Sequence, residues 1–401
     1  MFWRWATVIL LCVSLTFSFH RSSAQSIQNS PPKIEFPDWR HSGSRDSSEI
    51  YELAFPSAIV TDTIQNNTVP LRVFIPRDTK APTPAVIVLH YWGASDLKVE
   101  ENLARELNRR NVSAVLVTLP YHMLRTPPGS GSGEKAIQSD PTKLMLTMTQ
   151  AVSDVRRAID WIETRKEFQT GKVGIMGTSL GAVVASLTYA VEPRISNAAF
   201  LLGGADIAHI LWHSSRVVVQ REELRKKGYT ESKLREAIKE IEPLQWLQKR
   251  GPGTTFVIGA RFDTVIPHTD TQKLIDALPN AKTLWIDTGH YGGFVIQSSL
   301  LSAITRFFAN TLYDLPYKPP SRLFAPTIRA GATLDIDAGI QVGIGMDLWR
   351  NSPDAEAFGN LMFTPRGAQF FLGRRLDKNF SLGIIFKPKR TTFGAFWSVV
   401  F

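Results

Sequence analysis

The chain has little of several features that would narrow its function. Only one of its 401 residues is cysteine, Cys12, which lies in an apolar stretch near the N-terminus. A disulfide framework and a cysteine-ligated metal site are therefore excluded. Charged residues make up 20% of the chain and hydrophobic residues 43%, which excludes a wholly disordered chain, a collagen and a coiled coil. A core of normal size can form without covalent staples.

The sequence also lacks the signatures of nucleic-acid binding. Its formal charge is +10, and a surface of that sign favours acidic partners such as nucleic acid or anionic lipid. Lys and Arg are nevertheless scattered among acidic neighbours, as on an ordinary solvated surface. There is no zinc-ligand spacing, no P-loop and no basic run interleaved with stacking aromatics. We therefore expect no nucleic-acid partner.

Residues 1–24 are typical of a secretory signal peptide. Arg4 supplies the positive charge and an apolar stretch follows. Ser22 and Ala24 then place small side chains before a cleavage site at Gln25. The apolar stretch is too short to span a bilayer comfortably, and a retained N-terminal anchor is the alternative. The sequence thus predicts an exported protein, periplasmic or extracellular, whose mature chain carries no cysteine.

The rest of the chain divides into segments of different character. Residues 25–48 are rich in serine and predict a flexible arm. In residues 49–315, apolar runs alternate with amphipathic helical patterns. Within that segment, residues 121–141 hold three prolines and three glycines and predict a long loop at a strand end. Residues 205–250 carry a charged helical pattern that predicts a cap.

Residues 49–315 predict an α/β fold with a doubly wound, mostly parallel sheet. The apolar runs are near-continuous, as in strands covered on both faces, and they alternate with helices. The expected strands are Leu71–Ile75, Ala85–His90, Ser113–Thr118, Val173–Met176, Ala198–Leu202, Thr255–Ile258 and Thr283–Ile286. The expected helices are Asp96–Arg110, Pro141–Arg165, Leu180–Ala190, Thr269–Leu278 and Gly293–Leu312.

From about residue 320 the pattern changes to a strict alternation. Apolar side chains occupy every second position from Leu334 to Leu348, and they do so again in residues 380–386 and 393–401. A period of two predicts a C-terminal antiparallel β region, residues 316–401, with one apolar face.

Two interpretations of this β region remain open. The favoured one is a soluble sheet that packs its apolar face on the preceding domain, because about 80 residues provide four to five strands. The other is outer-membrane association through residues 320–401, since the terminal alternation resembles the last strand of bacterial outer-membrane barrels. The smallest single-chain barrels need eight strands, so only an oligomer that shares strands could close one.

The segment Lys172–Ala185, KVGIMGTSLGAVVA, contains the pattern Gly-x-Ser-x-Gly between a short apolar strand and a small-residue helix. Only a sharp strand-to-helix turn brings a serine hydroxyl out at the top of a sheet. Glycines are needed at such a turn because a Cβ would collide with the neighbouring strands and helix. Ser179 is therefore the predicted nucleophile, and an ordinary buried turn serine is the alternative.

A serine hydroxyl needs a base to take its proton, and the base is expected downstream in the order Ser, acid, His. His290 stands in a glycine-rich segment directly after the last apolar strand, from which an imidazole can reach back. Asp263 follows the expected strand Thr255–Ile258 and is favoured as the acid that orients His290. Asp287 is the competitor, but it lies too close in sequence to His290 to come from a separate strand end.

Two backbone N–H groups must hold the oxyanion of the tetrahedral intermediate. One predicted donor is the amide of Leu180, directly after the nucleophile. The other comes from the loop after the strand that ends at His90, where the amide of Trp92 is favoured over that of Tyr91. His90 itself is expected to bond the loop backbone.

Three further residues are candidates for binding the substrate: Tyr91, His122 and Arg125. The last two lie in the proline-rich loop, where a solvated position is the alternative.

Taken together, Ser179, Asp263, His290 and the loop His90–Ala94 resemble the α/β-hydrolase superfamily, and within it the serine esterases of the dienelactone-hydrolase-like branch. The resemblance covers about residues 60–312. One departure is Tyr91, which stands where such esterases often carry glycine.

The resemblance implies a serine hydrolase that cleaves a carboxylic ester through an acyl-enzyme, and the signal-like residues 1–24 add the expectation that it is exported. The expected substrate is a small-molecule or polysaccharide-linked acyl ester, and no cofactor or metal is required. The alternatives are a peptidase or thioesterase with the same residues, or a non-catalytic envelope protein on a hydrolase scaffold.

Overall fold

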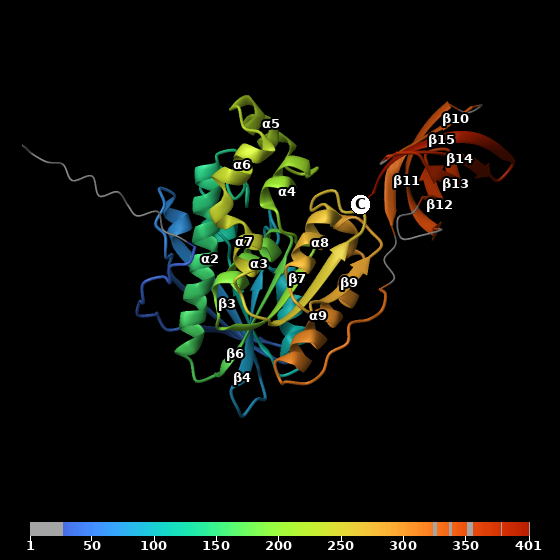
Figure 1. Ribbon diagram of the computed structural model, residues 1–401. Coiled ribbons are helices and arrows are strands. Elements are labelled where there is room, and N and C mark those ends of the chain that lie inside the picture. The colour runs from blue at the N-terminus through green and yellow to red at the C-terminus, as the bar shows by residue number, and fades with distance from the viewer. Residues whose placement is uncertain (1–26, 324–326, 337–338, 351–355, 378, 401) are drawn as a thin grey trace, which may run out of the picture.

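The computed structural model describes residues 27–323, 327–336, 339–350, 356–377 and 379–400, and the predicted signal peptide lies outside these residues. They form an α/β domain and a C-terminal barrel (Figure 1). Among the described residues, no helix is both long and apolar enough to cross a membrane.

A nine-stranded sheet forms the centre of the α/β domain, in the order β1-β2-β3-β5-β4-β6-β7-β8-β9. The six strands from β5 to β9 in this order run parallel, whereas β1, β2 and β3 pair antiparallel at one edge. The seven strands expected from the sequence correspond to β3–β9. The strands are β1 (Arg40–Arg45), β2 (Ser48–Pro56), β3 (Thr68–Pro76), β4 (Thr83–Leu89), β5 (Ser113–Val117), β6 (Phe168–Thr178), β7 (Ile195–Leu201), β8 (Thr254–Ala260) and β9 (Lys282–Ile286).

Helices cover both faces of this sheet, which confirms the predicted α/β class. One apolar core joins the sheet to α2, α3 and α8, and a second joins it to α1 and α9. The five expected helices are these five, and α9 begins four residues later than expected, after a 3-10 turn at His290–Phe294. Their bounds are α1 (Lys98–Asn108), α2 (Pro141–Glu163), α3 (Leu180–Val191), α8 (His268–Asp276) and α9 (Gln297–Thr311).

The segment expected as a flexible arm is instead part of the fold as far as the structure describes it. Ile27 is buried at 1% exposure. The backbone carbonyls of residues 27–29 accept hydrogen bonds from Arg156 at 2.8–3.3 Å. The strand β1 then pairs with β2 at the sheet edge. The prediction of a flexible arm rested on composition alone. A serine-rich segment can still be ordered when its backbone forms hydrogen bonds with a buried arginine and with a neighbouring strand.

The segment predicted as a cap is helical. It contains α4 (Ile207–His213), α5 (Val218–Lys226), α6 (Glu231–Ala237) and α7 (Pro243–Leu247). Figure 1 shows α4, α5 and α6 above one end of the sheet, whereas α7 packs against α3. Only the first part of the segment is therefore placed to cover the strand ends.

The C-terminal region forms a closed barrel of six antiparallel strands in the order β10-β11-β12-β13-β14-β15. The strands are β10 (Ile328–Asp335), β11 (Gly339–Arg350), β12 (Ala357–Thr364), β13 (Gly367–Arg375), β14 (Phe380–Lys387) and β15 (Arg390–Val400). The antiparallel prediction is confirmed. The expectation of four to five strands that close only by sharing between chains is wrong, because β15 pairs with β10 along seven residues of the same chain.

The barrel meets the α/β domain at the loop after β9. The backbone carbonyl of Asp287 accepts hydrogen bonds from the hydroxyl of Thr327 and, at 2.9 Å, from the guanidinium of Arg350. The same guanidinium lies 4.7 Å from the ring centre of Phe262. The apolar face of the β region does not make this contact, so the expectation that it packs on the preceding domain is also wrong.

One buried carboxyl group in the α/β domain makes stability depend on pH. Glu100 on α1 is 2% exposed, and neither of its carboxylate oxygens has a hydrogen-bond partner among the described residues. Burial raises the pKa of Glu100 to about 7, from an ordinary value of 4.5. A raised acid pKa means that ionisation opposes folding, so the destabilisation is absent below pH 4.5 and grows as the pH rises to about 7.

Replacing Glu100 by glutamine keeps the shape of the neutral acid and removes this penalty. We expect Glu100→Gln to raise the free energy of unfolding at pH 8 by up to about 3 kcal/mol, and to leave it nearly unchanged at pH 4. Urea denaturation at both pH values measures the difference. The control is Glu101→Gln, because Glu101 is paired with Arg72 and its replacement offers no such gain. An equal gain for Glu100→Gln at both pH values would contradict the interpretation.

Candidate active site

Ser179 occupies the sharp turn between β6 and α3. Its backbone φ is +55°, in a region that residues other than glycine rarely adopt. The turn is tight enough that a Cβ on Gly177 would overlap the backbone of Gly181, and one on Gly181 would overlap the carbonyl of Leu89 on β4. The two glycines of the sequence pattern are thus required by space, and they hold the Ser179 hydroxyl at the carboxyl end of the sheet.

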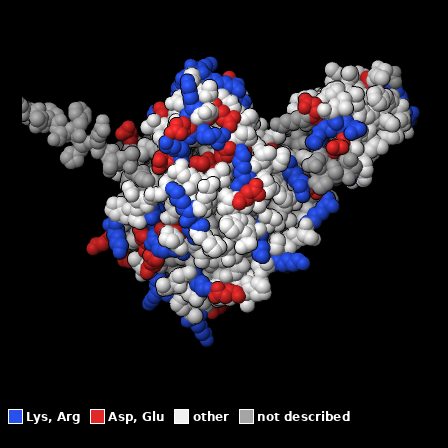
Figure 2. Space-filling model, viewed as in Figure 1, with Lys and Arg blue, Asp and Glu red and all other residues white. Residues whose placement is uncertain are grey.

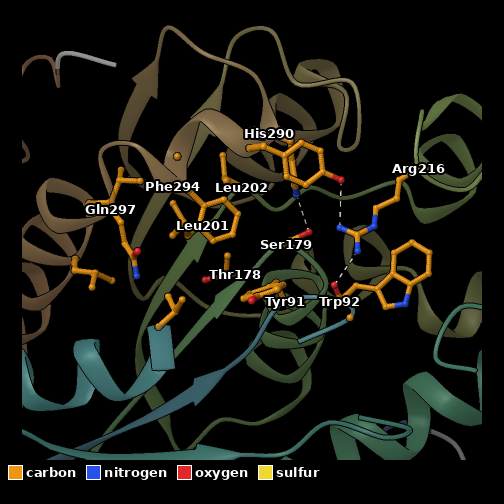
Figure 3. Close-up of a pocket in the computed structure, with 16 residues that line it drawn as sticks. Tyr91, Trp92, Thr178, Ser179, Leu201, Leu202, Arg216, His290, Phe294 and Gln297 are labelled. Carbon is orange, nitrogen blue, oxygen red and sulfur yellow. Dashed lines mark hydrogen bonds between the residues drawn. The ribbon is translucent and has the colours of Figure 1, made fainter. Parts of the chain in front are cut away.

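His290 and Asp263 meet Ser179 at this end of the sheet, and Figure 3 shows the contact between His290 and Ser179. The Ser179 Oγ lies 3.0 Å from His290 Nε2, and His290 Nδ1 lies 2.7 Å from Asp263 Oδ2. The other oxygen of Asp263 accepts the backbone N–H groups of Val265 and Ile266, both at 2.8 Å. A carboxylate can only accept, so Nδ1 carries the proton and Nε2 is left to accept from the serine hydroxyl.

Asp287, the competing acid, is engaged elsewhere. Its carboxylate lies 3.0 Å from the guanidinium of Arg261 and 3.0 Å from that of Arg322. The structure therefore brings Asp263, and not Asp287, to the imidazole of His290.

The two predicted oxyanion donors flank Ser179. The N–H of Leu180 is the first of α3 and has no acceptor within its own helix. In the loop after β4, the N–H of Gly93 is taken by His122 Nε2 at 3.0 Å, whereas no described residue accepts the N–H of Trp92. The amide of Trp92 is thus available at the edge of the site.

His122 was expected to face the substrate, and this expectation is wrong. The side chain is fully buried, with Nδ1 2.9 Å from the carbonyl of Pro120 and Nε2 accepting from Gly93. Burial lowers the pKa of His122 to about 4 and that of the neighbouring His90 to about 3, so both rings are neutral at pH 7. His90 bonds the carbonyl of Tyr91, and its other nitrogen accepts from a backbone N–H, in the role expected from the sequence.

Arg125 was also expected to face the substrate, and it too is structural. Its guanidinium is 0% exposed and pairs with Asp154 at 2.8 Å. It also donates to the backbone carbonyls of Thr118 and Asn66. Buried hydrogen bonds therefore hold the proline-rich loop against the domain. Its polar side chains bond backbone groups that a helix or strand would otherwise pair.

Two apolar cavities open on either side of Ser179. The larger, of about 230 Å³, includes Tyr91, the third substrate-binding candidate, and is lined further by Val99, Leu201, Leu202, Phe294, Leu300 and Leu301. The smaller, of about 70 Å³, is lined by Trp92, Ile137, Leu144, Met148, Ile207 and Ile210. The start of the cap and one residue of the proline-rich loop line the smaller cavity, while the larger is built mainly by the strand ends and α9.

Sequence reasoning missed Arg216, which bridges the mouth of the site (Figure 3). Its guanidinium donates to the carbonyl of Trp92 at 3.0 Å and to the hydroxyl of Tyr291 at 3.3 Å, and it stacks on the indole of Trp92. The cap thereby contacts both the oxyanion loop and the histidine loop. Nothing in the charged pattern of the cap distinguishes this arginine from its solvated neighbours. Tyr291 adjoins His290 in sequence, which is a signal that could have been used.

Comparison with known proteins places the α/β domain. A family model described as alpha/beta hydrolase domain containing 18 matches residues 12–250. YtaP of Bacillus subtilis (strain 168), which is named as a hydrolase, is 28% identical over 129 residues. That match covers 30% of this chain and 43% of YtaP, so the chain spans less than half of this curated relative.

Two solved structures share the fold. The acetyl xylan esterase from Paenibacillus sp. R4 superposes with a TM-score of 0.54 at 15% identity, over 68% of this chain and 86% of the esterase. Acetyl xylan esterase 1 from Thermoanaerobacterium sp. JW/SL YS485 gives 0.53 at 14% identity, over 72% and 92%. The family match confirms the resemblance to the α/β-hydrolase superfamily, and the two solved structures share its fold.

The geometry predicts unequal roles for the two aspartates. In Asp263→Asn the amide favours the wrong tautomer of His290, so we expect kcat on an activated ester to fall on the order of 10⁴-fold. Asp287→Asn is the matched control and should cost far less, because its carboxylate binds arginines rather than His290. Steady-state kinetics on p-nitrophenyl acetate measure both. If Asp287→Asn were the more damaging change, the acid would be Asp287.

Proposed function

Because the chain belongs to the alpha/beta hydrolase domain containing 18 family, we propose that it is a serine esterase that cleaves a carboxylic ester through Ser179, His290 and Asp263. The observation that carries the proposal is the continuous relay of hydrogen bonds from Asp263 through His290 to the Ser179 hydroxyl, at 2.7 and 3.0 Å. The family match ends at residue 250, so the acid and the base rest on geometry alone.

In the acylation step, the Ser179 oxygen attacks the ester carbonyl carbon while His290 Nε2 takes the hydroxyl proton. Asp263 stabilises the imidazolium that forms. The negative charge that develops on the carbonyl oxygen is held by the amides of Leu180 and Trp92. The bond to the alcohol oxygen then breaks, and Nε2 returns the proton to that oxygen, so that the alcohol leaves neutral.

In the deacylation step, a water molecule takes the place of the alcohol. His290 removes one proton from this water as the water oxygen attacks the acyl carbon. The same two amides hold the second oxyanion. The bond to Ser179 breaks, the proton returns to the serine oxygen, and the carboxylic acid is released. The two steps need no group beyond the protein and water.

The substrate class follows from the cavities. Their linings are mainly aliphatic and aromatic, which suits an acyl group and the apolar part of an alcohol. The names of the two fold neighbours assign them acetylated xylan. A small-molecule or polysaccharide-linked acyl ester is therefore the proposed substrate.

Two alternatives use the same scaffold. A peptidase or thioesterase would employ the same three side chains, because they serve any acyl transfer. A non-catalytic envelope protein would need none of them, and it gives no reason for a serine held at φ +55° within 3.0 Å of an imidazole. An oxygen ester is the proposed substrate because both fold neighbours are named as acetyl xylan esterases.

We also propose that the protein is exported and acts in the periplasm or outside the cell. The signal-like residues 1–24 support this. Cleavage before Gln25 would also leave Ile27, whose side chain is buried, on the mature protein. Outer-membrane association, the second interpretation left open by the sequence, is a separate proposal, since it rests on the barrel and not on Ser179.

The role of Ser179 is tested by its removal. We expect Ser179→Ala to lose activity on p-nitrophenyl esters on the order of 10⁶-fold, and to lose labelling by a fluorophosphonate probe. Ser186→Ala is the control, because Ser186 lies on the same helix, bonds its own helix backbone and lies outside both cavities. A tenth of the rate remaining in Ser179→Ala would exclude Ser179 as nucleophile. A native protein that neither labels nor hydrolyses would establish the non-catalytic alternative.

The larger cavity is tested by filling it. A Cβ on Gly293 would lie 3.4 Å from Leu202 and 3.5 Å from Leu300, in ordinary contact inside the cavity. We expect Gly293→Leu to lower the rate on long-chain esters relative to acetates, measured with one series of graded acyl chains and one of graded alcohols. Gly292→Ala is the contrast, because its Cβ would overlap Thr288 and disturb the loop for all substrates equally. Unchanged chain-length profiles in both series would show that substrate does not enter this cavity.

A further inference from the structure

The outer face of the barrel is apolar around its whole circumference. Apolar side chains point outward from every strand, and many are more than half exposed, such as Val342 at 60%, Ile344 at 60% and Phe363 at 61%. The large outward residues are Leu334, Ile340, Val342, Ile344, Met346, Leu348, Phe363, Leu372, Phe380, Ile384, Phe386, Phe393 and Trp397. In the view of Figure 2 most of the barrel surface is uncharged, whereas both signs of charge are interspersed over the α/β domain.

The inside of the barrel is largely polar, which reverses the usual arrangement of a soluble barrel. Arg329 is 2% exposed and pairs with Asp347 at 2.9 Å. Asn360 donates to the same carboxylate at 2.8 Å, and Gln369 donates to the hydroxyl of Thr333 at 2.8 Å. Five apolar residues, Phe358, Met362, Phe371, Ile385 and Phe396, share the interior with these groups. The small core leaves most of the apolar side chains of the barrel on its surface.

The barrel also closes without an unpaired edge. All six neighbouring pairs of strands, including β10 with β15, are antiparallel ladders. Glycines make this narrow closure fit, because a Cβ on Gly343 or Gly383 would overlap the backbone of the adjacent strand. In hydrocarbon a strand is tolerated only where every backbone N–H and C=O is paired in such a closed ring.

The position of the apolar surface determines what can cover it. A protein partner or a second copy of the chain would cover one side of the barrel, whereas the exposed apolar side chains belong to all six strands. Only an apolar medium that surrounds the barrel buries them all. The strands are 8–12 residues long, close to the 9–11 residues that a tilted strand needs to cross a bilayer.

The charges at the rim fit the same medium. Consecutive strands of the barrel run in opposite directions, so every second turn lies at the same end. The β12–β13 and β14–β15 turns therefore share one end of the barrel. Their exposed charged residues are basic: Arg366, Lys389 and Arg390. At the same end the buried carboxylate of Asp335, beside the β10–β11 turn, pairs with Lys387 and Arg390. Phe363, Phe386 and Phe393 stand next to these turns on the outer face. In membrane proteins, aromatic residues are enriched at the boundary of the acyl chains, and basic residues beyond them bind anionic headgroups.

We propose that the barrel β10–β15 is embedded in a lipid bilayer, with its outer face against acyl chains and its basic turns at anionic headgroups. Its six strands make it narrower than the eight-stranded rings that are the smallest single-chain outer-membrane barrels, and glycines at the strand crossings make room for that narrower closure. For a chain that is exported as proposed above, we assign this bilayer to the outer membrane. The proposal does not depend on the chemistry at Ser179. It corrects the favoured interpretation of the sequence, in which the apolar face packs on the α/β domain.

The absence of cysteine from the mature chain provides a direct test. In full-length protein with Cys12→Ala, single cysteines are introduced at Ile344 or Ile384 on the outer face of the barrel. The matched control is Val219→Cys on α5, which is exposed at 68%. Cell envelopes are treated with a water-soluble maleimide and, in parallel, with a lipid-soluble one. With the water-soluble reagent, we expect Ile344→Cys and Ile384→Cys to react at least about tenfold more slowly than Val219→Cys, because hydrocarbon excludes this reagent. With the lipid-soluble reagent we expect no such difference.

Fractionation of the same cells completes the test. The full chain should sediment with membranes, resist a carbonate wash and be released by detergent. Labelling of Ile344→Cys as fast as Val219→Cys would overturn the proposal. So would a soluble protein in the periplasm or the cytoplasm, even if an oligomer protected the cysteines, because a second copy would then cover the barrel. Hydrolysis of p-nitrophenyl acetate, measured on each fraction, reports the proposed esterase activity independently of where the chain is found.

Discussion

The turn between β6 and α3 is the constraint on which the α/β domain depends. A serine hydroxyl is presented above the sheet only if the backbone reverses within one residue, and Ser179 does so at a φ of +55°. The strain is tolerated because β4 and β7 flank β6 and hold it: the N–H of Ser179 bonds to the carbonyl of Leu201, at 2.8 Å, on the neighbouring strand. The approach of α3 to β4 leaves no room for a side chain at Gly181. Backbone packing therefore fixes the position of the hydroxyl before any side chain contributes.

The loops around the Ser179 hydroxyl are held by buried side chains that bond their backbone. Each loop that approaches Ser179 carries backbone groups that have no regular partner, and buried side chains supply the partners. His122 takes the N–H of Gly93, Arg125 takes two carbonyls of the neighbouring loops, and Asp263 takes two N–H groups after β8. The polar residues near the site divide into those that hold loops and those that face the cavity. Charge and hydrogen bonding alone do not distinguish the two groups.

This division explains how far the sequence could predict the structure. Apolar runs located the strands β3–β9, since a strand covered on both faces has to be apolar, and Gly-x-Ser-x-Gly located the sharp turn at Ser179 because few other residues fit that turn. His122 and Arg125 were misplaced, since a polar side chain in a loop gives no signal of which way it points. The strands β1 and β2 were both missed. The edge strand β1 is exposed and needs no apolar pattern, and β2 has only an interrupted alternation of buried and exposed positions. Alternation after residue 330 predicted an apolar face, but a local period of two records neither how many strands pair nor whether the last one meets the first.

The carbonyl of Asp287 belongs at once to the histidine loop and to the barrel, and this has a consequence for where the chain can be divided. It lies three residues before His290, and its two side-chain donors, Thr327 and Arg350, both come from the C-terminal region. A chain cut at residue 315 would remove both donors from the loop that carries His290, and would also uncover the ring of Phe262 beside Asp263. The part that resembles other hydrolases is therefore not a detachable module with an appendage. An engineered boundary placed at the end of α9 would remove the two side-chain donors that hold the loop carrying His290.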